Sequence, residues 1–390
     1  MLNGPLREVG LGIASIETAV EAIREGRMVI LVDDEDRENE GDLVVAAEKI
    51  TPEGIQFMAH EGRGLICLSL TSEQVGQLGL APMVDANKAP LGTAFTVSVD
   101  AADLKEDGIS AQARAHTILE AIRADATPQT LMSPGNMHPL AARAGGVLVR
   151  AGQTEGSVDL ARLAGLHPSG VICEIMSEDG SMARLPELLA FGEKHSIPVV
   201  TVADLIEYRM HRERLVRAST RAFLPTEYGE FEIIAYETDL DPAAHIVLQH
   251  GEISADKPTL VRVHRADLLE DTLGVGLTRG RHKLDMAMRR IASEGSGLLL
   301  YLRGDTLEDD LSTTLARYCS PNTFRVRSRS DPSTSAAPPM DFRDFGIGAQ
   351  ILADMGLQQL RVISDHPLAF KGLGGFGLEI VEWVPLALSY

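Results

Sequence analysis

The densest group of side chains that could do chemistry lies between residues 33 and 42. The stretch "DDEDRENEGD" holds seven carboxylates and directly follows the apolar run "MVILV". A charge run is most often a solvated loop. Several oxygen atoms held together also suit a hard divalent cation, and Arg37 beside Glu38 and Asp42 could meet an anionic ligand. The sequence therefore leaves an exposed acidic loop and a cation site open as interpretations.

Three further segments carry candidate groups. In "LVRAGQT", Arg150 and Thr154 follow a predicted strand and enter a predicted helix, whose free N–H groups could hold a phosphate. In "GVICEIM", Glu174 stands mid-strand between apolar residues, where burial would raise its pKa toward acid–base work. A half-exposed edge-strand residue is the alternative for Glu174. In "GRGLICL", Cys67 is more simply a core residue than a nucleophile.

Composition limits the class of protein. The chain has 390 residues, and its 44% hydrophobic and 24% charged content is typical of a globular protein with two or three domains. A net charge of −20 argues against a nucleic-acid surface. Three widely spaced cysteines make neither a disulfide framework nor a zinc signature. Without an eighteen-residue apolar stretch or a signal-peptide core, we expect no membrane association and a cytoplasmic protein.

The predicted elements indicate an α+β fold. Helical and strand patterns alternate in the first half, with both hairpin-like and crossover connections. We place a first domain at residues 1–212, a linker at 213–224 and a second domain at 225–390. The arginine-rich segment 207–221 is predicted as a basic connecting helix, and the Pro/Ser-rich segment 321–340 as a loop.

Several of these stretches together resemble a known family. The motifs are "DDEDRENEGDL", "TAFTVSVDA", "GVICEIM", "ADLIEYR", "LPTEYGEF" and "FGIGAQIL", in family order and at family spacing. Residues 15–212 resemble 3,4-dihydroxy-2-butanone 4-phosphate synthase, and residues 225–390 resemble GTP cyclohydrolase II. The whole chain resembles the bifunctional riboflavin-biosynthesis proteins that fuse the two. The resemblance implies two domains, each a mixed sheet with packed helices, and a homodimer.

The resemblance also implies a lyase reaction. The synthase family converts ribulose 5-phosphate, a small sugar phosphate, to 3,4-dihydroxy-2-butanone 4-phosphate and formate with Mg²⁺. The positions that match the family site are Arg37, Glu38, Asp42, Arg150, Thr154 and Glu174, with Glu38 as a metal ligand. Asp33 and Cys67 lie in matching stretches and are expected to line the same site.

The chain departs from the family pattern at that site. Gln153 stands where the family has its metal-ligating histidine, and Asn136 replaces a second histidine. Asp107 and Ala113 replace a threonine and an aspartate. The Gln153 carbonyl can still bind Mg²⁺ but cannot take up a proton, so we expect weaker Mg²⁺ binding and impaired chemistry. His138, two residues beyond Asn136, is a candidate replacement because both would share a strand face.

The second domain departs further. The positions of the family's three zinc cysteines hold Asp267, Thr278 and Gly280, while the later Asp341 and Arg343 are kept. Without thiolates we expect no zinc and no cyclohydrolase activity. Three hypotheses follow: a working or attenuated synthase, a lyase or isomerase on another sugar phosphate, and a non-catalytic paralogue that regulates a riboflavin-pathway enzyme.

Overall fold

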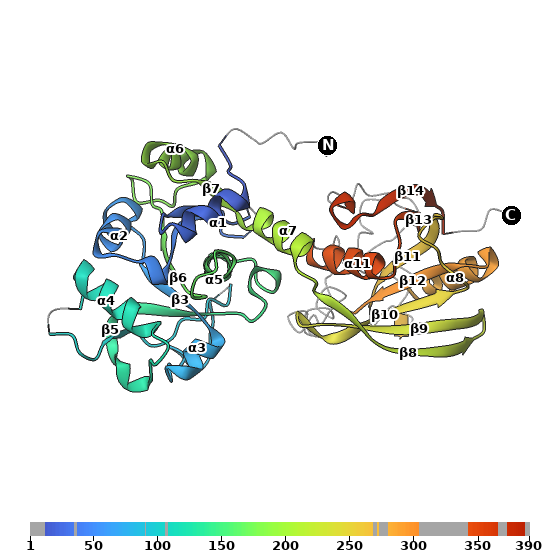
Figure 1. Ribbon diagram of the computed structural model, residues 1–390, viewed down its shortest axis with the longest axis horizontal. Helices are drawn as coiled ribbons and strands as arrows, with labels where there is room; N and C mark the ends of the chain where they lie inside the picture. The colour runs from blue at the N-terminus through green and yellow to red at the C-terminus, as the bar shows by residue number, and fades with distance from the viewer. Residues whose placement is uncertain are drawn as a thin grey trace, which may run out of the picture. The chain divides into compact units, whose positions relative to one another are not determined.

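The computed structural model describes residues 12–34, 37–89, 91–105, 108–267, 271–272, 280–303, 342–365 and 373–386. The chain divides into two compact units, Met1–Arg209 and Met210–Tyr390. Each unit contains a seven-stranded sheet with helices packed on it (Figure 1). The expected α+β class with two mixed-sheet domains is confirmed.

The sheet of the first unit has the strand order β4-β5-β3-β6-β2-β1-β7. Its strands are β1 (Val29–Val32), β2 (Gly41–Ala46), β3 (Cys67–Thr71), β4 (Val99–Ala101), β5 (Leu131–Ala142), β6 (Gly170–Glu174) and β7 (Val199–Thr201). β2 pairs antiparallel with both β1 and β6, whereas β3–β5 and β1–β7 are parallel. This mixture explains why hairpin-like and crossover connections alternate along the sequence.

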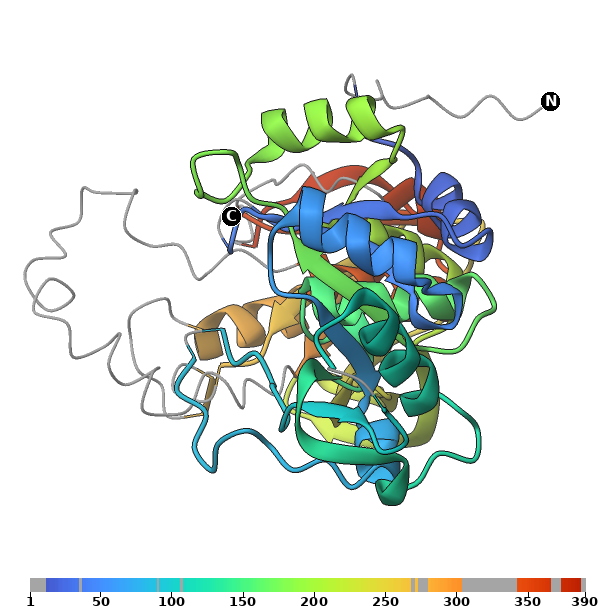
Figure 2. The ribbon, with the colours of Figure 1, turned by 90° about the vertical axis from the view of Figure 1, so that its left-hand side faces the viewer.

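Helices flank this sheet, which Figure 2 shows turned toward the viewer. They are α1 (Ile16–Arg24), α2 (Pro52–Phe57), α3 (Ser72–Gln77), α4 (Ala111–Ala121), α5 (Gln153–Leu163), α6 (Leu185–His195) and α7 (Val202–Arg212). The side chains of Ser15 and Thr51 accept hydrogen bonds from backbone N–H groups of α1 and α2 and so cap these two helices.

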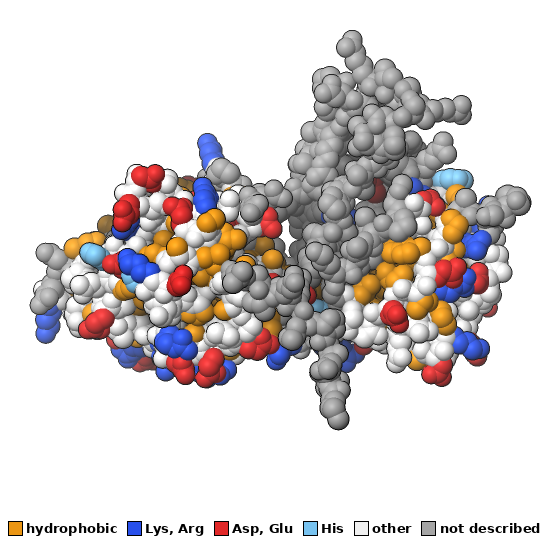
Figure 3. Space-filling view, turned by 90° about the horizontal axis from the view of Figure 1, so that it is seen from above, with side chains coloured by type: hydrophobic (Ala, Val, Ile, Leu, Met, Phe, Trp, Pro, Cys, Tyr) orange, Lys and Arg blue, Asp and Glu red, His pale blue; other side chains and the backbone are white. Residues whose placement is uncertain are grey.

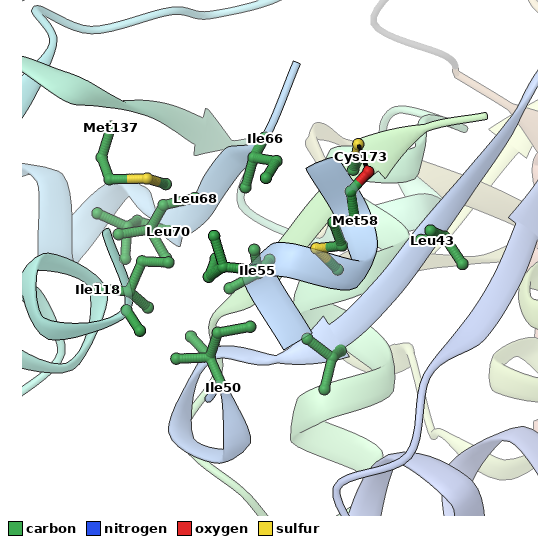
Figure 4. Close-up of a cluster of buried hydrophobic side chains, with 14 of the residues drawn as sticks. Leu43, Ile50, Ile55, Met58, Ile66, Leu68, Leu70, Ile118, Met137 and Cys173 are labelled. Carbon is green, nitrogen blue, oxygen red and sulfur yellow. Dashed lines mark hydrogen bonds between the residues drawn. The ribbon is translucent and has the colours of Figure 1, made fainter. Parts of the chain in front are cut away.

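The two faces of the sheet have different tasks. On one face, alternate strand residues such as Leu43, Leu68 and Met137 join Ile55 of α2 and Ile118 of α4 in the main apolar core (Figure 4). Strand residues between them point to the opposite face, where α5 packs. That second face carries the polar side chains described below.

The second unit begins at Met210, six residues before its first strand, β8, starts at Val216. Its sheet has the order β14-β13-β11-β12-β10-β9-β8. Its elements are β8 (Val216–Thr226), β9 (Gly229–Thr238), β10 (Asp241–His250), β11 (Thr259–Arg265), α8 (Gly280–Glu294), β12 (Gly297–Leu302), α11 (Phe342–Asp354), β13 (Gln359–Ile363) and β14 (Glu379–Val384). The Gln350 side chain of α11 donates to the carbonyls of Met210 and Glu213 and accepts from the N–H of Leu215.

The expected linker at 213–224 and the expected connecting helix are wrong. α7 ends at Arg212, and residues 216–226 form β8, which pairs with β9 along its length. The arginines suit a strand because Arg217 and Arg221 form ion pairs with Glu237 and Glu232 of β9. The segment 321–340 lies outside the described residues.

Two surface properties bear on partners. Acidic and basic side chains are interspersed over the described residues on the face shown in Figure 3. Among the helices that the structure describes, none combines the length and apolar character needed to span a bilayer.

Candidate active site

Two carboxylates form the centre of the site on the α5 face. Asp42, near the start of β2, lies directly opposite Glu174, the last residue of β6. Glu174 is therefore at a strand end and half-buried, rather than mid-strand as predicted. Burial raises the pKa of Asp42 well above its ordinary value, and the neighbouring Glu174 and Glu38 raise it further. The structure therefore favours a protonated Asp42 beside Glu174.

The Glu174 side chain is held by the segment before β3. Its Oε2 accepts a hydrogen bond of 2.7 Å from the backbone N–H of Leu65. Gly64 lies so close that a Cβ at that position would be 2.5 Å from both Oε2 and the carbonyl oxygen of Glu174. A side chain at residue 64 would therefore displace Glu174. The sequence analysis did not identify Gly64, although the motif "GRG" marks a close backbone approach.

Cys67, at the start of β3, borders the same centre. It is buried, and its pKa is raised by burial and by the nearby Glu174 and Asp42. The thiol is thus neutral, and a neutral thiol is a poor nucleophile. The structure therefore favours Cys67 as a residue that lines the site rather than as a nucleophile.

Arg37 organises the acidic stretch. Its Nη1 donates to Asp33 Oδ2 at 2.5 Å, to Glu38 Oε2 at 2.7 Å and to Gln153 Oε1 at 2.9 Å. Asp33 also accepts from the backbone N–H groups of Glu38 and Glu40, so its carboxylate closes the turn. The interpretation as an exposed acidic loop fails for these residues, because the Asp33 side chain is fully buried.

Gln153 is the first residue of α5 and is only 5% exposed. Since a guanidinium can only donate, the amide atom that faces Arg37 is the oxygen. Its Nε2 is therefore directed away from Arg37, and in the described part of the chain this buried atom has no hydrogen-bond partner.

Two guanidinium groups meet at the N-terminus of α5. Gly152 is the N-cap and supplies no side-chain cap to the free N–H groups of the helix. A Cβ on Gly152 would be 2.4 Å from Arg150 Nη1 and 3.1 Å from Arg37 Nη2. Thr154 is buried in the first turn of the helix. Guanidinium groups, a helix N-terminus and a hydroxyl are groups that proteins use to bind phosphate.

A buried carboxylate holds one of these arginines. Glu155 Oε2 accepts from Arg150 Nη1 at 2.7 Å, and its Oε1 accepts from the backbone N–H of Arg143. Arg150 also donates to Thr93 Oγ1 and to the carbonyl oxygen of Leu91. Glu155 was not among the site residues predicted from the sequence, where its place in the first turn of a predicted helix is the only sign of a role.

The side chains present do not form a Mg²⁺ site as they are arranged. Glu38 and Gln153, the predicted ligands, do converge, but both give their oxygen atoms to the same nitrogen of Arg37. A cation at that point would have to displace the guanidinium. Within the described ranges, no group of three or more His, Cys, Asp or Glu side chains could hold a metal ion.

Comparison with known proteins places this geometry in a family. Residues 17–208 match the model of 3,4-dihydroxy-2-butanone 4-phosphate synthase, and residues 216–385 match that of GTP cyclohydrolase II. The riboflavin biosynthesis protein RibBA of Aquifex aeolicus is 48% identical over 96% of this chain and 93% of its own length. The chain belongs to this riboflavin-biosynthesis family.

Two other members of the riboflavin-biosynthesis family are named for the synthase alone. The 3,4-dihydroxy-2-butanone 4-phosphate synthase of Pseudomonas aeruginosa is 44% identical and matches over 96% of this chain and all of its own length. The crystal structure of RibBX, a two-domain synthase from A. baumannii, is 41% identical and superposes with a TM-score of 0.78. The superposition covers 95% of this chain and 99% of that chain.

Among the other positions that depart from the family pattern, Asn136 and Ala113 lie in the described residues. Asn136 of β5 donates from Nδ2 to Asp100 Oδ2 at 2.7 Å, and its backbone N–H bonds the other oxygen. His138 lies opposite Cys67, on the face of the sheet that carries Asp42, and its buried Nδ1 has no hydrogen-bond partner in the described part. Ala113 is buried in α4, and Asp107 lies outside the described residues.

The second domain keeps a polar cluster near the family's zinc position. Asp271 accepts from His264 Nε2 at 3.0 Å, from the Tyr301 hydroxyl at 2.9 Å and from the backbone N–H of Asp267 at 2.9 Å. His264 and Tyr301 are stacked with ring centroids 5.5 Å apart. These contacts hold Asp271 against His264 of β11 and Tyr301 of β12. Thr278, Asp341 and the side chain of Arg343 lie outside the described residues, and Gly280 is the first residue of α8.

Proposed function

We propose that the first domain binds ribulose 5-phosphate and converts it to 3,4-dihydroxy-2-butanone 4-phosphate and formate, more slowly than family members with histidine at positions 136 and 153. The proposal is supported mainly by one observation: the residues at the start of α5 are connected to the carboxylates of β2 and β6. Arg37, at the start of α5, is paired with Glu38, and the charge of Glu38 acts on Asp42, which lies opposite Glu174. A sugar phosphate has an anionic end and a polyol end that such a pair of sites can hold.

The phosphate is proposed to bind Arg150, the Thr154 hydroxyl and the free N–H groups of α5. Gly152 has no side chain at the N-cap, so the Arg150 and Arg37 guanidinium groups and the Glu155 carboxylate can lie close to its backbone. Because Glu155 and Thr93 fix the Arg150 guanidinium, the helix and the arginine present a preorganised site.

Proton transfer is assigned to the carboxylate pair. Burial raises the pKa of Asp42 well above its ordinary value, and the Glu174 carboxylate at the opposite strand position raises it further, so a proton on Asp42 is favoured. Asp42 can give that proton to an oxygen of the sugar, and Glu174, fixed by the N–H of Leu65, can accept one from carbon. Enolisation and dehydration of ribulose 5-phosphate require both transfers.

We expect a slow rate because Asn136 and Gln153 carry amides where the family has histidines. Neither Asn136 nor Gln153 can exchange a proton, and the Asn136 amide is already held by Asp100. Mg²⁺ is expected to bind weakly, because it would have to displace Arg37 from the oxygen atoms of Glu38 and Gln153. When bound, Mg²⁺ would stabilise negative charge on the sugar oxygens.

The second domain is proposed to lack cyclohydrolase activity. Its sequence has no cysteine at any of the three family zinc positions. Relatives that match this chain over both domains, from Pseudomonas aeruginosa and A. baumannii, are named as synthases without mention of a cyclohydrolase. The domain is accordingly assigned a structural or regulatory role, and the protein is proposed to be a homodimer, which light scattering tests directly.

The experiment is a formate assay. The purified chain with ribulose 5-phosphate and Mg²⁺ is expected to release formate measurably but roughly 10²-fold or more slowly than a member with both histidines, the usual effect of losing an acid–base group. Release at the full family rate would contradict the reading of the two amides. Formation of a different product, or turnover of another pentose phosphate only, would favour the alternative lyase or isomerase.

A second candidate is a non-catalytic regulator of a riboflavin-pathway enzyme. The observation in its favour is the engagement of both amides in the protein's own polar contacts, Asn136 with Asp100 and Gln153 with Arg37. Binding of ribulose 5-phosphate without any formate release, at any Mg²⁺ concentration, would select this candidate.

A further inference from the structure

Gln153 contains an unsatisfied hydrogen-bond donor at the start of α5, beside Arg37. Nearly all buried polar atoms in folded proteins have a partner, and an unpaired one costs free energy. The Nε2 of Gln153 is such an atom within the described residues, although its amide oxygen is bonded at 2.9 Å. An unpaired donor next to a ligand site marks a contact that a ligand completes.

The orientation of this amide is fixed by Arg37. Exchanging the amide atoms would set an N–H group against the Arg37 N–H at 2.9 Å, which is a repulsive contact between two donors. Asp33 and Glu38 hold the guanidinium in place, so the oxygen of Gln153 stays on the Arg37 side. The group that Gln153 presents on its other side is therefore an NH₂ donor, which repels a cation and attracts an oxygen.

We propose that Gln153 Nε2 donates a hydrogen bond to an oxygen of the bound sugar phosphate, so that an N–H group contacts the ligand where the family has a metal ligand. This proposal rests on the proposed function. The ligand oxygen lies between the phosphate at the start of α5 and the carboxylates, because Gln153 is the first residue of that helix. Arg37 and Glu38 are partly exposed beside it, with side-chain exposures of 16% and 30%, and the ligand enters on that side.

A consequence is that ligand binding does not depend on a divalent cation. The positive charge that Glu38 requires is supplied by Arg37 at 2.7 Å, within the chain itself. A donor at position 153 then completes the recognition of the sugar oxygen.

The test compares two substitutions that change charge equally. Gln153→Glu keeps an oxygen facing Arg37 and replaces the donor with an acceptor. Gln56→Glu makes the same change at an exposed residue of α2, on the other side of the sheet. Calorimetric titration with ribulose 5-phosphate in EDTA gives the affinity, formate is assayed in the same samples, and the Tm of the ligand-free protein gives the stability.

The expected result is that the wild type and Gln56→Glu bind equally well in EDTA, and that Gln153→Glu binds roughly tenfold more weakly or worse. The Tm of Gln153→Glu is expected to be no lower than that of the wild type, because its contact with Arg37 gains charge. A merely structural role for Gln153 would lower affinity and Tm together. Gln153→Met provides a second variant, without charge, that also removes the donor and is expected to lose affinity.

Two results overturn the inference while leaving the proposed function intact. One is undiminished binding by Gln153→Glu and Gln153→Met in EDTA. The other is wild-type binding that occurs only after Mg²⁺ is added. If the wild type binds ribulose 5-phosphate under neither condition, the proposed function fails and the inference fails with it.

Discussion

Asp42 and Glu174 lie directly opposite each other on the antiparallel strands β2 and β6, on the face of the sheet that packs against α5. Their neighbours Leu43 and Cys173 point to the opposite face and join the main core. Because side chains alternate along a strand, the pair Leu43 and Cys173 lies in the core, and the adjacent pair Asp42 and Glu174 lies in the site. Burying the Asp42 carboxylate destabilises the fold. The proton transfer proposed for Asp42 explains why a carboxylate is placed there.

Asp42→Asn is expected to stabilise the fold while abolishing formate release. Burial, then Glu174, raises the pKa of Asp42 in the folded state, so the folded chain binds more protons than the unfolded chain. Stability therefore falls as pH rises from the ordinary pKa of about 3.9 toward the raised one. At about pH 8 the substitution is expected to raise the free energy of unfolding, and this gain shrinks toward about pH 4.

Thermal melts at several pH values measure the effect of Asp42→Asn. Asp85→Asn, at an exposed position, is the control and is expected to leave both the Tm and its pH dependence unchanged. A Tm that falls in Asp42→Asn at about pH 8 would show that the carboxylate is ionised and stabilising in the folded state.

Gly64→Ala tests how Glu174 is positioned. The new methyl group would overlap Glu174 Oε2, so the carboxylate has to move and its bond to the Leu65 N–H is lost. We expect kcat for formate release to fall roughly tenfold or more, with a smaller change in KM. Gly76→Ala is the matched control, since a Cβ there meets nothing within 4 Å. Equal activity of the two variants would mean that Glu174 needs no fixed position.

Gly152→Ala tests the phosphate site. A methyl group at this N-cap would push against Arg150 and Arg37 and occupy space in front of the α5 N–H groups. The KM for ribulose 5-phosphate is therefore expected to rise roughly tenfold, with kcat less affected. Gly54→Ala in α2, where the nearest contact is an ordinary 3.4 Å, serves as the reference. A loss confined to kcat would place the phosphate elsewhere.

Restoring imidazoles tests the reading of the amides. Gln153→His combined with Asn136→His is expected to increase Mg²⁺-dependent formate release roughly tenfold or more, because both positions regain a proton carrier. Asn136→His also breaks two hydrogen bonds to Asp100, so the single variants are measured beside the double one. If none of the three gains activity, the regulator hypothesis is favoured over the slow synthase.

Metal analysis tests the second domain. Aspartate, threonine and glycine at positions 267, 278 and 280 leave no thiolate for zinc. We expect no stoichiometric zinc in the purified chain and no formate release from GTP, even after incubation with zinc. Stoichiometric zinc together with GTP turnover would show that other side chains replace the cysteines.

Local sequence patterns predicted the features that depend on residues close together in the chain. Thr154 lies in the first turn of α5 as predicted, whereas Gly146–Leu148, just before Arg150, form a short 3-10 helix rather than the predicted strand. The resemblance to the family added which motifs belong to one site. Both kinds of inference depend on residues close in sequence or on motif order.

The remaining features depend on contacts between distant segments. Arg37 and Gln153 are 116 residues apart, so no local pattern showed that the guanidinium takes the oxygen of the amide. The arginines at 217 and 221 suit a helix face as well as a strand, and only the glutamates of β9 decide between them. Gly64 matters because Glu174, far along the chain, packs against it.

The short distance from α7 to β8 has a practical consequence for dissecting the chain. Only residues 213–215 separate Arg212 from Val216, and the Gln350 side chain already bonds the backbone of Met210, Glu213 and Leu215. A cut within 216–226 would remove all or part of the edge strand β8. The backbone N–H and C=O groups of β9 that pair with it would then be exposed, and an exposed strand edge promotes aggregation. An expression fragment of the second half therefore has to start at or before Met210.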